Sequence, residues 1–332
     1  MSFQDIVGQD KIINYLLGAY KNDRIYQSYL FYGPQAIGKL ELARNFAKLL
    51  NCQDNQYDAC DHCSSCIKIN NNNHPDIHFI GPDLTGFISI EAVRNLGRAI
   101  NLRPFEARKN VFIISDAHCL TDEAQNGLLK AIEEPTKDAI IILITSRIDL
   151  LFATIISRCQ RLRFSALGPE KLKEVIKRKH LTEERYAHFL AYFSEGSLKE
   201  ANKYMDTKFL YYRDKIIGFV LRPRSLNLEG LLDDFRDKEK ARDLLKLLVS
   251  IFRDLLLLKI GLSLDHLINI DKIQVLSSLK DKYSKESLEQ IISDTFSLNN
   301  YIEQNINFKM ALNWLSLRMS PEEDIYERAG IS

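Results

Sequence analysis

The feature that most constrains this chain is the segment from residue 33 to residue 40, which reads GPQAIGKL. It matches the phosphate-loop pattern G-x-x-x-x-G-K-[S/T] at Gly33, Gly38 and Lys39, and departs from it at Leu40. A short apolar run precedes the loop and a helical pattern follows it. In that context, backbone N–H groups at the glycines and at the helix start can bind phosphate, and Lys39 can neutralise the outer phosphates. The segment therefore predicts a nucleotide-binding α/β domain.

Two groups that an active ATPase needs are absent from the expected positions. Leu40 stands where a serine or threonine hydroxyl would bind Mg²⁺. The strand that should end in an Asp-Glu pair reads Val111-Phe-Ile-Ile-Ser-Asp116, with a single carboxylate. Without a well-held metal or a pair of groups to position water, hydrolysis should be slow or absent. Binding of ATP or ADP through Lys39 and the loop backbone stays open.

Strand and helix patterns alternate through the first half of the chain. Continuous β-branched runs at 111–114 and 140–144, like the apolar run at 29–32, are typical of strands covered on both faces of a parallel sheet. Between the later two runs, Thr121 is expected to cap a helix that Pro135 stops. Strand, helix and strand in this order predict right-handed crossovers around a parallel sheet.

From about Leu167 the pattern becomes entirely helical. Short helices are expected at 169–180, 183–193 and 197–205, and a long leucine-rich one at 241–258. The basic residues of the first of these alternate with glutamates, which favours a solvated face over a DNA-binding one. We therefore expect three domains: an α/β domain over 1–166, a small helical domain over 167–206 and an all-helical domain over 207–332.

Four of the six cysteines form the pattern C-x7-C-x2-C-x2-C. They are Cys52, Cys60, Cys63 and Cys66. Two successive C-x2-C steps can direct thiolates at one ion, and the remaining cysteine completes a tetrahedral S₄ shell. The polar segment over about 52–66 is too short to bury a core, so a structural zinc would fold it as a knuckle. His62 and His74 are alternative ligands, and Cys119 and Cys159 are expected to be buried thiols outside the cluster.

The bulk properties argue against several classes of protein. A net charge of +1 over 332 residues provides no overall basic footprint for nucleic acid. The N-terminus, MSFQDIVGQDKII, lacks the pattern of a secretory signal, and the best apolar run, at 139–145, has the length of a strand. We expect a cytoplasmic protein that does not contact a membrane.

Several motifs occur together and in order: Phe3-Gln-Asp-Ile-Val-Gly-Gln9, the phosphate loop, the cysteine cluster, Leu128-Leu-Lys-Ala-Ile-Glu-Glu-Pro135 and Ser157-Arg-Cys159. In combination they resemble the AAA+ clamp-loader subunits of bacterial DNA polymerase III. The resemblance is firmest from residue 1 to about 205, and the helical remainder fits the collar domain of that family by composition. It implies an α/β P-loop (AAA+) domain with a parallel sheet, followed by a small helical lid and an all-α collar.

Within this family, Leu40 and the single carboxylate of Asp116 favour the delta-prime subunit over the ATP-hydrolysing gamma/tau subunits, as does the lack of a long extension like that of tau. Lys39 is the complication, because a degenerate loop need not keep its lysine. An active gamma/tau-like ATPase is therefore one alternative. A zinc-knuckle DNA-binding protein unrelated to clamps is a second alternative.

The resemblance also implies roles for single residues. Arg158, which would otherwise be interpreted as a surface arginine in a basic stretch, would reach as an arginine finger into the ATP site of a neighbouring subunit. Val7 and Gly8 would lie near an adenine. Lys199 stands in a second sensor segment where an active subunit usually carries arginine, which again suggests a weakened site.

The partners that the resemblance implies are the gamma/tau and delta subunits and, through the assembly, the sliding clamp and primer–template DNA. The chain would serve DNA replication within the DNA polymerase III holoenzyme, a nucleotidyltransferase. It is expected to have no ATPase activity of its own.

Overall fold

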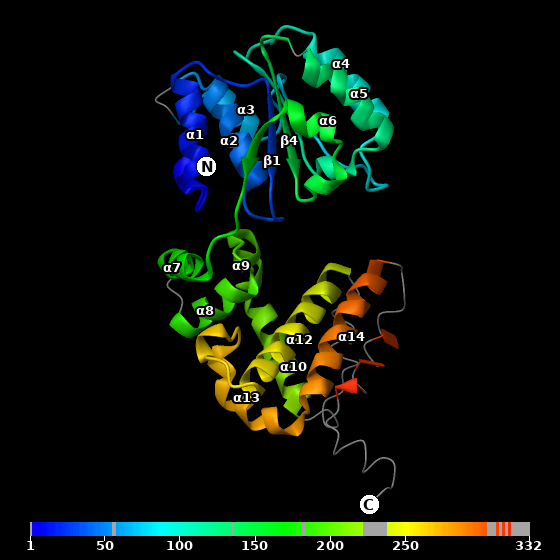
Figure 1. Cartoon of the computed structure of the whole chain (residues 1–332). Coiled ribbons are helices and arrows are strands. Elements are labelled where there is room, and N and C mark those ends of the chain that lie inside the picture. The colour runs from blue at the N-terminus through cyan, green and yellow to red at the C-terminus, as the bar shows by residue number, and fades with distance from the viewer. Residues whose placement is uncertain are drawn as a thin grey trace, which may run out of the picture. The chain divides into compact units, whose positions relative to one another are not determined.

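The structure, a computed structural model, describes residues 2–54, 58–134, 136–180, 183–221 and 238–303, together with 310–311, 314–315 and 318–319. The chain divides into two compact units, Met1–Leu167 and Gly168–Ser332. The helices and strands of each unit are drawn in Figure 1.

Unit 1 is built on a five-stranded parallel sheet with the strand order β2-β3-β4-β1-β5. The strands are β1 (Ser28–Tyr32), β2 (Ile77–Ile80), β3 (Asn110–Ile114), β4 (Ala139–Thr145) and β5 (Gln160–Arg163). Every residue of β3 and β4 is buried, as expected for inner strands covered on both faces. The predicted strands β1, β3 and β4 are confirmed, whereas the two edge strands are not predicted from the sequence.

Helices cover both faces of this sheet (Figure 1). One face packs against α1 (Asp10–Lys21), α2 (Lys39–Asn51) and α3 (Ser64–Asn70), and the other against α4 (Ile90–Ile100), α5 (Asp122–Glu133) and α6 (Ala153–Arg158). Side chains alternate between the two cores along each strand: in β1, Phe31 belongs to the first core and Leu30 to the second. Because the strands are all parallel, their carboxyl ends lie at the same edge of the sheet. The phosphate loop follows β1 at this edge.

The predicted start of α5 is confirmed. The Thr121 hydroxyl accepts a hydrogen bond from the backbone N–H of Ala124 at 3.2 Å, which satisfies one donor of the first turn. Asp122 and Glu123 place negative charge at the positive end of the helix. The helix ends at Glu133, and Pro135, predicted to stop it, lies outside the described residues.

The secondary-structure elements described in unit 2 are all helical. They are α7 (Pro169–His180), α8 (Glu184–Phe193), α9 (Leu198–Tyr204), α10 (Thr207–Leu221), α12 (Lys238–Lys259), α13 (Ile273–Leu279) and α14 (Lys285–Glu303), with short 3-10 turns. The helices expected from the sequence are confirmed to within a few residues, which is the usual uncertainty of helix ends. The division of this unit into a lid and a collar stays a prediction.

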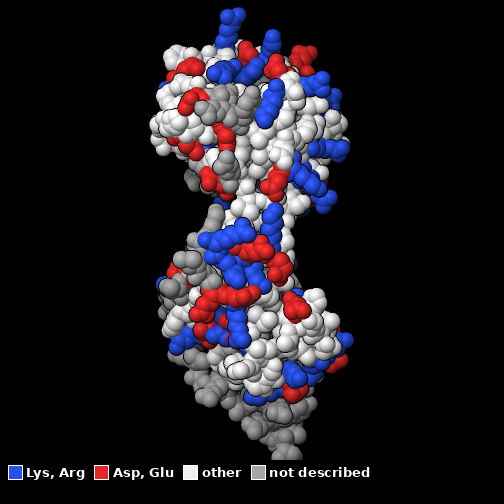
Figure 2. Space-filling view, turned by 90° about the vertical axis from the view of Figure 1, so that its left-hand side faces the viewer, with Lys and Arg blue, Asp and Glu red and all other residues white. Residues whose placement is uncertain are grey.

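Several basic residues of α7 form ion pairs with glutamates. Lys173 lies 3.2 Å from Glu170 and 3.5 Å from Glu184, and Arg178 lies 3.9 Å from Glu174. Figure 2 shows basic and acidic side chains intermixed on the face of unit 2 that carries this helix. The helix therefore has a mixed, solvated face, as the sequence indicates.

Candidate functional site

The phosphate loop joins β1 to α2, and its backbone needs glycine. The φ angles are 145° at Gly33 and 87° at Gly38, a region that side chains disfavour. A Cβ on Gly33 would lie 2.3 Å from the carbonyl oxygen of Phe164, so no larger residue fits. Because α2 begins at Lys39, the N–H groups of its first turn face this loop, and the positive end of the helix favours an anion there.

The Lys39 side chain is folded back onto its own loop. It is only 7 % exposed, and its Nζ donates to the carbonyl oxygen of Gly33 at 2.8 Å and also to that of Pro34. Burial lowers the pKa of Lys39, while the nearby carboxylates of Asp116 and Glu41 oppose that shift. The ammonium must exchange these carbonyl oxygens for phosphate oxygens if a nucleotide binds.

Of the two positions beside the loop that would hold magnesium, one lacks a suitable side chain and the other offers a single carboxylate. Leu40 packs against the core formed with α1 and α2. At the end of β3, Ser115 donates its hydroxyl to the carbonyl oxygen of Ile80 at 3.2 Å. Asp116 follows with φ at 47° and is the single carboxylate between residues 111 and 118. The strand end therefore offers one acidic ligand where hydrolysis needs a pair.

Gln9 fastens the N-terminal segment to this loop. Its side-chain Nε2 donates to the carbonyl oxygen of Ser165 at 2.9 Å and to that of Ile37, within the phosphate loop, at 3.4 Å. The residue belongs to a motif singled out in the sequence, but its contacts are not predictable from that motif. It links three segments that are distant along the chain.

Val7 and Gly8 lie in the segment that Gln9 holds. Gly8 has φ at 86°, and a Cβ there would lie 2.3 Å from the Leu167 side chain, so glycine is required. Ile6 lies close to Gly38, 4.0 Å from where a Cβ on that glycine would stand. The expected adenine-side residues are thus next to the phosphate loop, which makes one contiguous candidate nucleotide site.

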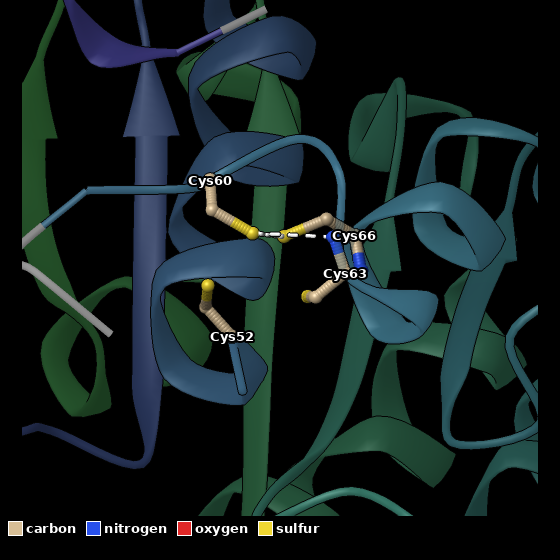
Figure 3. Close-up of side chains that lie close together, drawn as sticks. All are labelled: Cys52, Cys60, Cys63 and Cys66. Atoms are coloured by element: carbon tan, nitrogen blue, oxygen red, sulfur yellow. Dashed lines mark hydrogen bonds between the residues drawn. The ribbon is translucent and has the colours of Figure 1, made fainter. Parts of the chain in front are cut away.

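The four predicted cysteine ligands come together in space. Figure 3 shows Cys52 at the end of α2, Cys60 in the following loop, and Cys63 and Cys66 at the start of α3. Their sulfur atoms all lie within 4.8 Å of one another, close to the spacing of about 3.8 Å that a tetrahedral shell of Zn–S bonds requires. Four thiols in this arrangement fit a structural zinc.

Backbone groups around the cluster favour thiolates. The N–H of Cys63 donates to the Cys60 sulfur at 3.3 Å, and the N–H of Cys66 donates to the Cys63 sulfur at 3.5 Å. Burial opposes ionisation of Cys63, yet hydrogen bonds from the Cys66 and Gln53 backbone help lower its pKa to about 6. Backbone N–H groups that donate to the sulfur atoms orient the ligands of a metal and stabilise their negative charge.

The other thiols and imidazoles named from the sequence lie in different surroundings. His62 is exposed and contacts Asp54 at 2.9 Å, and with Cys60 these two form a second, overlapping set of potential ligands. His74 is buried and accepts a hydrogen bond from the backbone N–H of Asp76 at 3.2 Å. Cys159 is buried as expected, whereas Cys119 is only half-buried.

Contacts of Asp61 and Asp58 connect the knuckle to the rest of unit 1. Asp61, in the knuckle, lies 2.5 Å from the Nζ of Lys48, whose side chain on α2 is 0 % exposed. Asp58 accepts a hydrogen bond from the backbone N–H of Phe3 at 3.2 Å. The knuckle therefore holds both the end of α2 and the start of the N-terminal segment.

Arg158 is the last residue of α6 and is exposed. Its Nη2 lies 2.8 Å from Oε1 of Glu133, at the end of α5, and its Nη1 donates to the carbonyl oxygen of Thr154 at 3.0 Å. The sequence alone does not identify Glu133 as the partner of Arg158, although Glu133 lies in the motif that runs from Leu128 to Pro135. In unit 2, Lys199 lies in α9, directly after the helix start that Ser197 caps.

None of the helices in the described part of the chain is both long and apolar enough to span a bilayer.

Comparisons with known proteins identify relatives of this chain. The family described as "DNA polymerase III, delta subunit" matches residues 8–168, and the family of its C-terminal region matches residues 229–319. The delta-prime subunit of DNA polymerase III from Bacillus subtilis is 29% identical over 318 residues, which cover 94% of this chain and 96% of that one. The tau subunit of the same organism is 28% identical over 316 residues, 87% of this chain and 54% of tau. A solved gamma subunit-related protein from Thermotoga maritima covers 94% of this chain and 98% of its own, with a TM-score of 0.48 and 17% identity.

A parallel sheet in the order β2-β3-β4-β1-β5, with a phosphate loop after β1 and helices on both faces, defines an α/β P-loop protein, and the predicted fold class is confirmed. The chain belongs to the delta-prime clamp-loader subunits of bacterial DNA polymerase III, which are related to gamma and tau.

Proposed function

We propose that this chain supports loading of the sliding clamp onto primed DNA by completing the ATP site of a neighbouring clamp-loader subunit, and that it does not hydrolyse ATP itself. The observation that carries the proposal is an exposed guanidinium, Arg158, in a chain whose own phosphate loop has Leu40 in place of the hydroxyl. The partners would be gamma/tau and delta in the cytoplasm, with the clamp and primer–template DNA contacted through the assembly.

The chemistry of Arg158 suits a finger that acts in trans. A guanidinium carries five N–H donors, stays charged at all physiological pH values, and can bridge two phosphate oxygens at once. The side chain is 39 % exposed at the end of a helix, so another chain can approach it. If a partner subunit places its ATP at this surface, the guanidinium can stabilise the negative charge that develops during phosphoryl transfer.

The local site favours binding over hydrolysis. Lys39 and the N–H groups at the start of α2 can neutralise phosphate, but Leu40 cannot bind Mg²⁺ and Asp116 lacks an acidic neighbour at residue 115 or 117.

The experiment that tests the whole proposal is ATP turnover by the complete loader assembled with Arg158→Ala. Unchanged DNA-stimulated turnover would contradict it.

Lys39 favours one other candidate, an active gamma/tau-like ATPase. We expect the purified chain to bind ATP or ADP without turnover, and Lys39→Ala to weaken that binding by about 10- to 100-fold, because a charge-assisted contact is lost. Titration of the isolated chain with a fluorescent ATP analogue measures the change, and exposed Lys21→Ala is a matched control on the neighbouring helix. Hydrolysis by the isolated chain at clamp-loader rates, abolished by Lys39→Ala, would establish the ATPase instead.

We also propose that Cys52, Cys60, Cys63 and Cys66 bind a structural zinc. The support is the four-sulfur cluster and its N–H donors. A closed shell of four protein ligands leaves no position for a substrate, so the ion would stabilise the fold and take no part in catalysis.

A further inference from the structure

The guanidinium of Arg158 already has partners within the chain. Its two terminal nitrogens are both engaged, Nη2 with the Glu133 carboxylate at 2.8 Å and Nη1 with the Thr154 carbonyl oxygen at 3.0 Å. These are the nitrogens that a bidentate bridge to phosphate uses. Each of these nitrogens has a second N–H, but a phosphate bound there would be repelled by the adjoining Glu133 carboxylate, so the side chain must leave Glu133 to act on a neighbour's ATP.

The position of Glu133 explains why it holds the arginine. It is the last residue of α5, and the C-terminal end of a helix carries about half a negative charge, which disfavours a carboxylate there. Glu134 adds a second carboxylate directly after it. Helix α6 packs against α5 (Figure 1). The last residue of α6, Arg158, brings a cation to this negative end. The guanidinium thus relieves repulsion that α5 would otherwise carry.

The same pair is weak enough to exchange. The Arg158 and Glu133 side chains are 39 % and 44 % exposed, so solvent and salt screen their attraction. An exposed ion pair of this kind favours the paired over the unpaired state by only about 1.4- to 5-fold. A nucleoside triphosphate carries more negative charge than one carboxylate, and it can therefore displace Glu133 when a neighbouring subunit docks.

We propose that Glu133 is a positioning residue that holds Arg158 against the end of α5 in the free chain and releases it to the phosphates of the neighbour's ATP. The inference rests on the proposed arginine finger. It adds that Glu133 and the phosphates of the neighbour's ATP compete for Arg158, so the ion pair with Glu133 breaks each time Arg158 binds phosphate. Removing the charge of Glu133 should then increase the share of Arg158 that is available to phosphate.

The test is DNA-stimulated ATP turnover by the complete loader assembled with Glu133→Gln. We expect kcat to rise by about 1.4- to 5-fold at low salt, with KM unchanged, and the gain to shrink as salt screens the pair in the parent chain. Glu134→Gln is the matched control, because it removes the same charge from the next residue. An unchanged or lowered kcat for Glu133→Gln, or an equal gain for Glu134→Gln, would overturn the proposal.

A second pair of variants shows whether Glu133 acts through the arginine. In an Arg158→Ala background, Glu133→Gln should have no effect on turnover, whereas a purely structural role of Glu133 would persist there. If Arg158→Ala alone changes nothing, the arginine finger itself is contradicted. If Arg158→Ala lowers turnover but Glu133→Gln has no effect of its own, only the competition is wrong.

Discussion

Replacing Arg158 with alanine should slow ATP hydrolysis by about 10³-fold or more at the neighbouring site that this chain completes. The reason is that a guanidinium at the subunit boundary stabilises the negative charge that develops on the transferred phosphoryl group. Alanine provides no positive charge to compensate it. Single-turnover hydrolysis by the complete loader, with the clamp and primed DNA present, measures the effect at that site. Steady-state turnover would change less if other sites in the assembly continue to work.

The controls separate loss of the finger from loss of assembly. Arg161→Ala removes another exposed arginine, three residues away on β5, and should leave turnover near the parent value. Arg158→Lys keeps the charge but loses the planar fork of donors, so it should restore little activity. Co-purification of each variant with the gamma/tau and delta subunits shows that the complex has formed. A loader that contains Arg158→Ala and hydrolyses ATP normally would remove the proposed role.

The inner part of the fold is predictable because its signals are local. The strands β3 and β4 are continuous apolar runs, and Thr121 caps the next helix through a contact three residues away. The edge strands carry no such signal. In β5, only Leu162 is buried, and in β2 only Ile77 is, so neither shows the apolar run or the strict alternation that identifies a strand.

The same distinction holds for the candidate sites. The cysteine ligands lie within 15 residues of one another, and metal-ligand spacing is visible along the chain. The contacts that support the sites join distant residues: Gln9 reaches Ser165, which is 156 positions away, and Arg158 pairs with Glu133 from another helix. Only the folded chain brings these pairs together, so a motif can mark the residues without revealing their partners.

Removal of the proposed zinc should destabilise unit 1 as well as the knuckle, because the buried Lys48 contacts a knuckle residue. Its side chain on α2 is 0 % exposed, and its Nζ lies 2.5 Å from Asp61. If the knuckle unravels without zinc, this ammonium loses the Asp61 carboxylate, and the free energy of unfolding should fall by about 1.5–3 kcal/mol, the contribution of a hydrogen bond to a charged group. The Phe3 amide loses Asp58 at the same time, so the N-terminal segment beside the phosphate loop should loosen too. Urea unfolding of the isolated chain, with and without a chelator, measures the loss, and a colorimetric assay measures the zinc released.

Variants make this dependence specific. Cys66→Ser should reproduce the effect of the chelator, whereas Cys119→Ser, at a half-buried thiol outside the cluster, should not. Lys48→Met removes the buried charge while keeping most of the volume of the side chain, so metal loss should cost this variant less than it costs the parent chain. Faster hydrogen exchange at the Phe3 amide, without a change at the inner strand β4, would locate the loosening at the knuckle and its attachments. If chelation releases zinc but leaves the unfolding free energy and the Phe3 amide unchanged, then the knuckle folds independently of the metal and Lys48 keeps its partner without it.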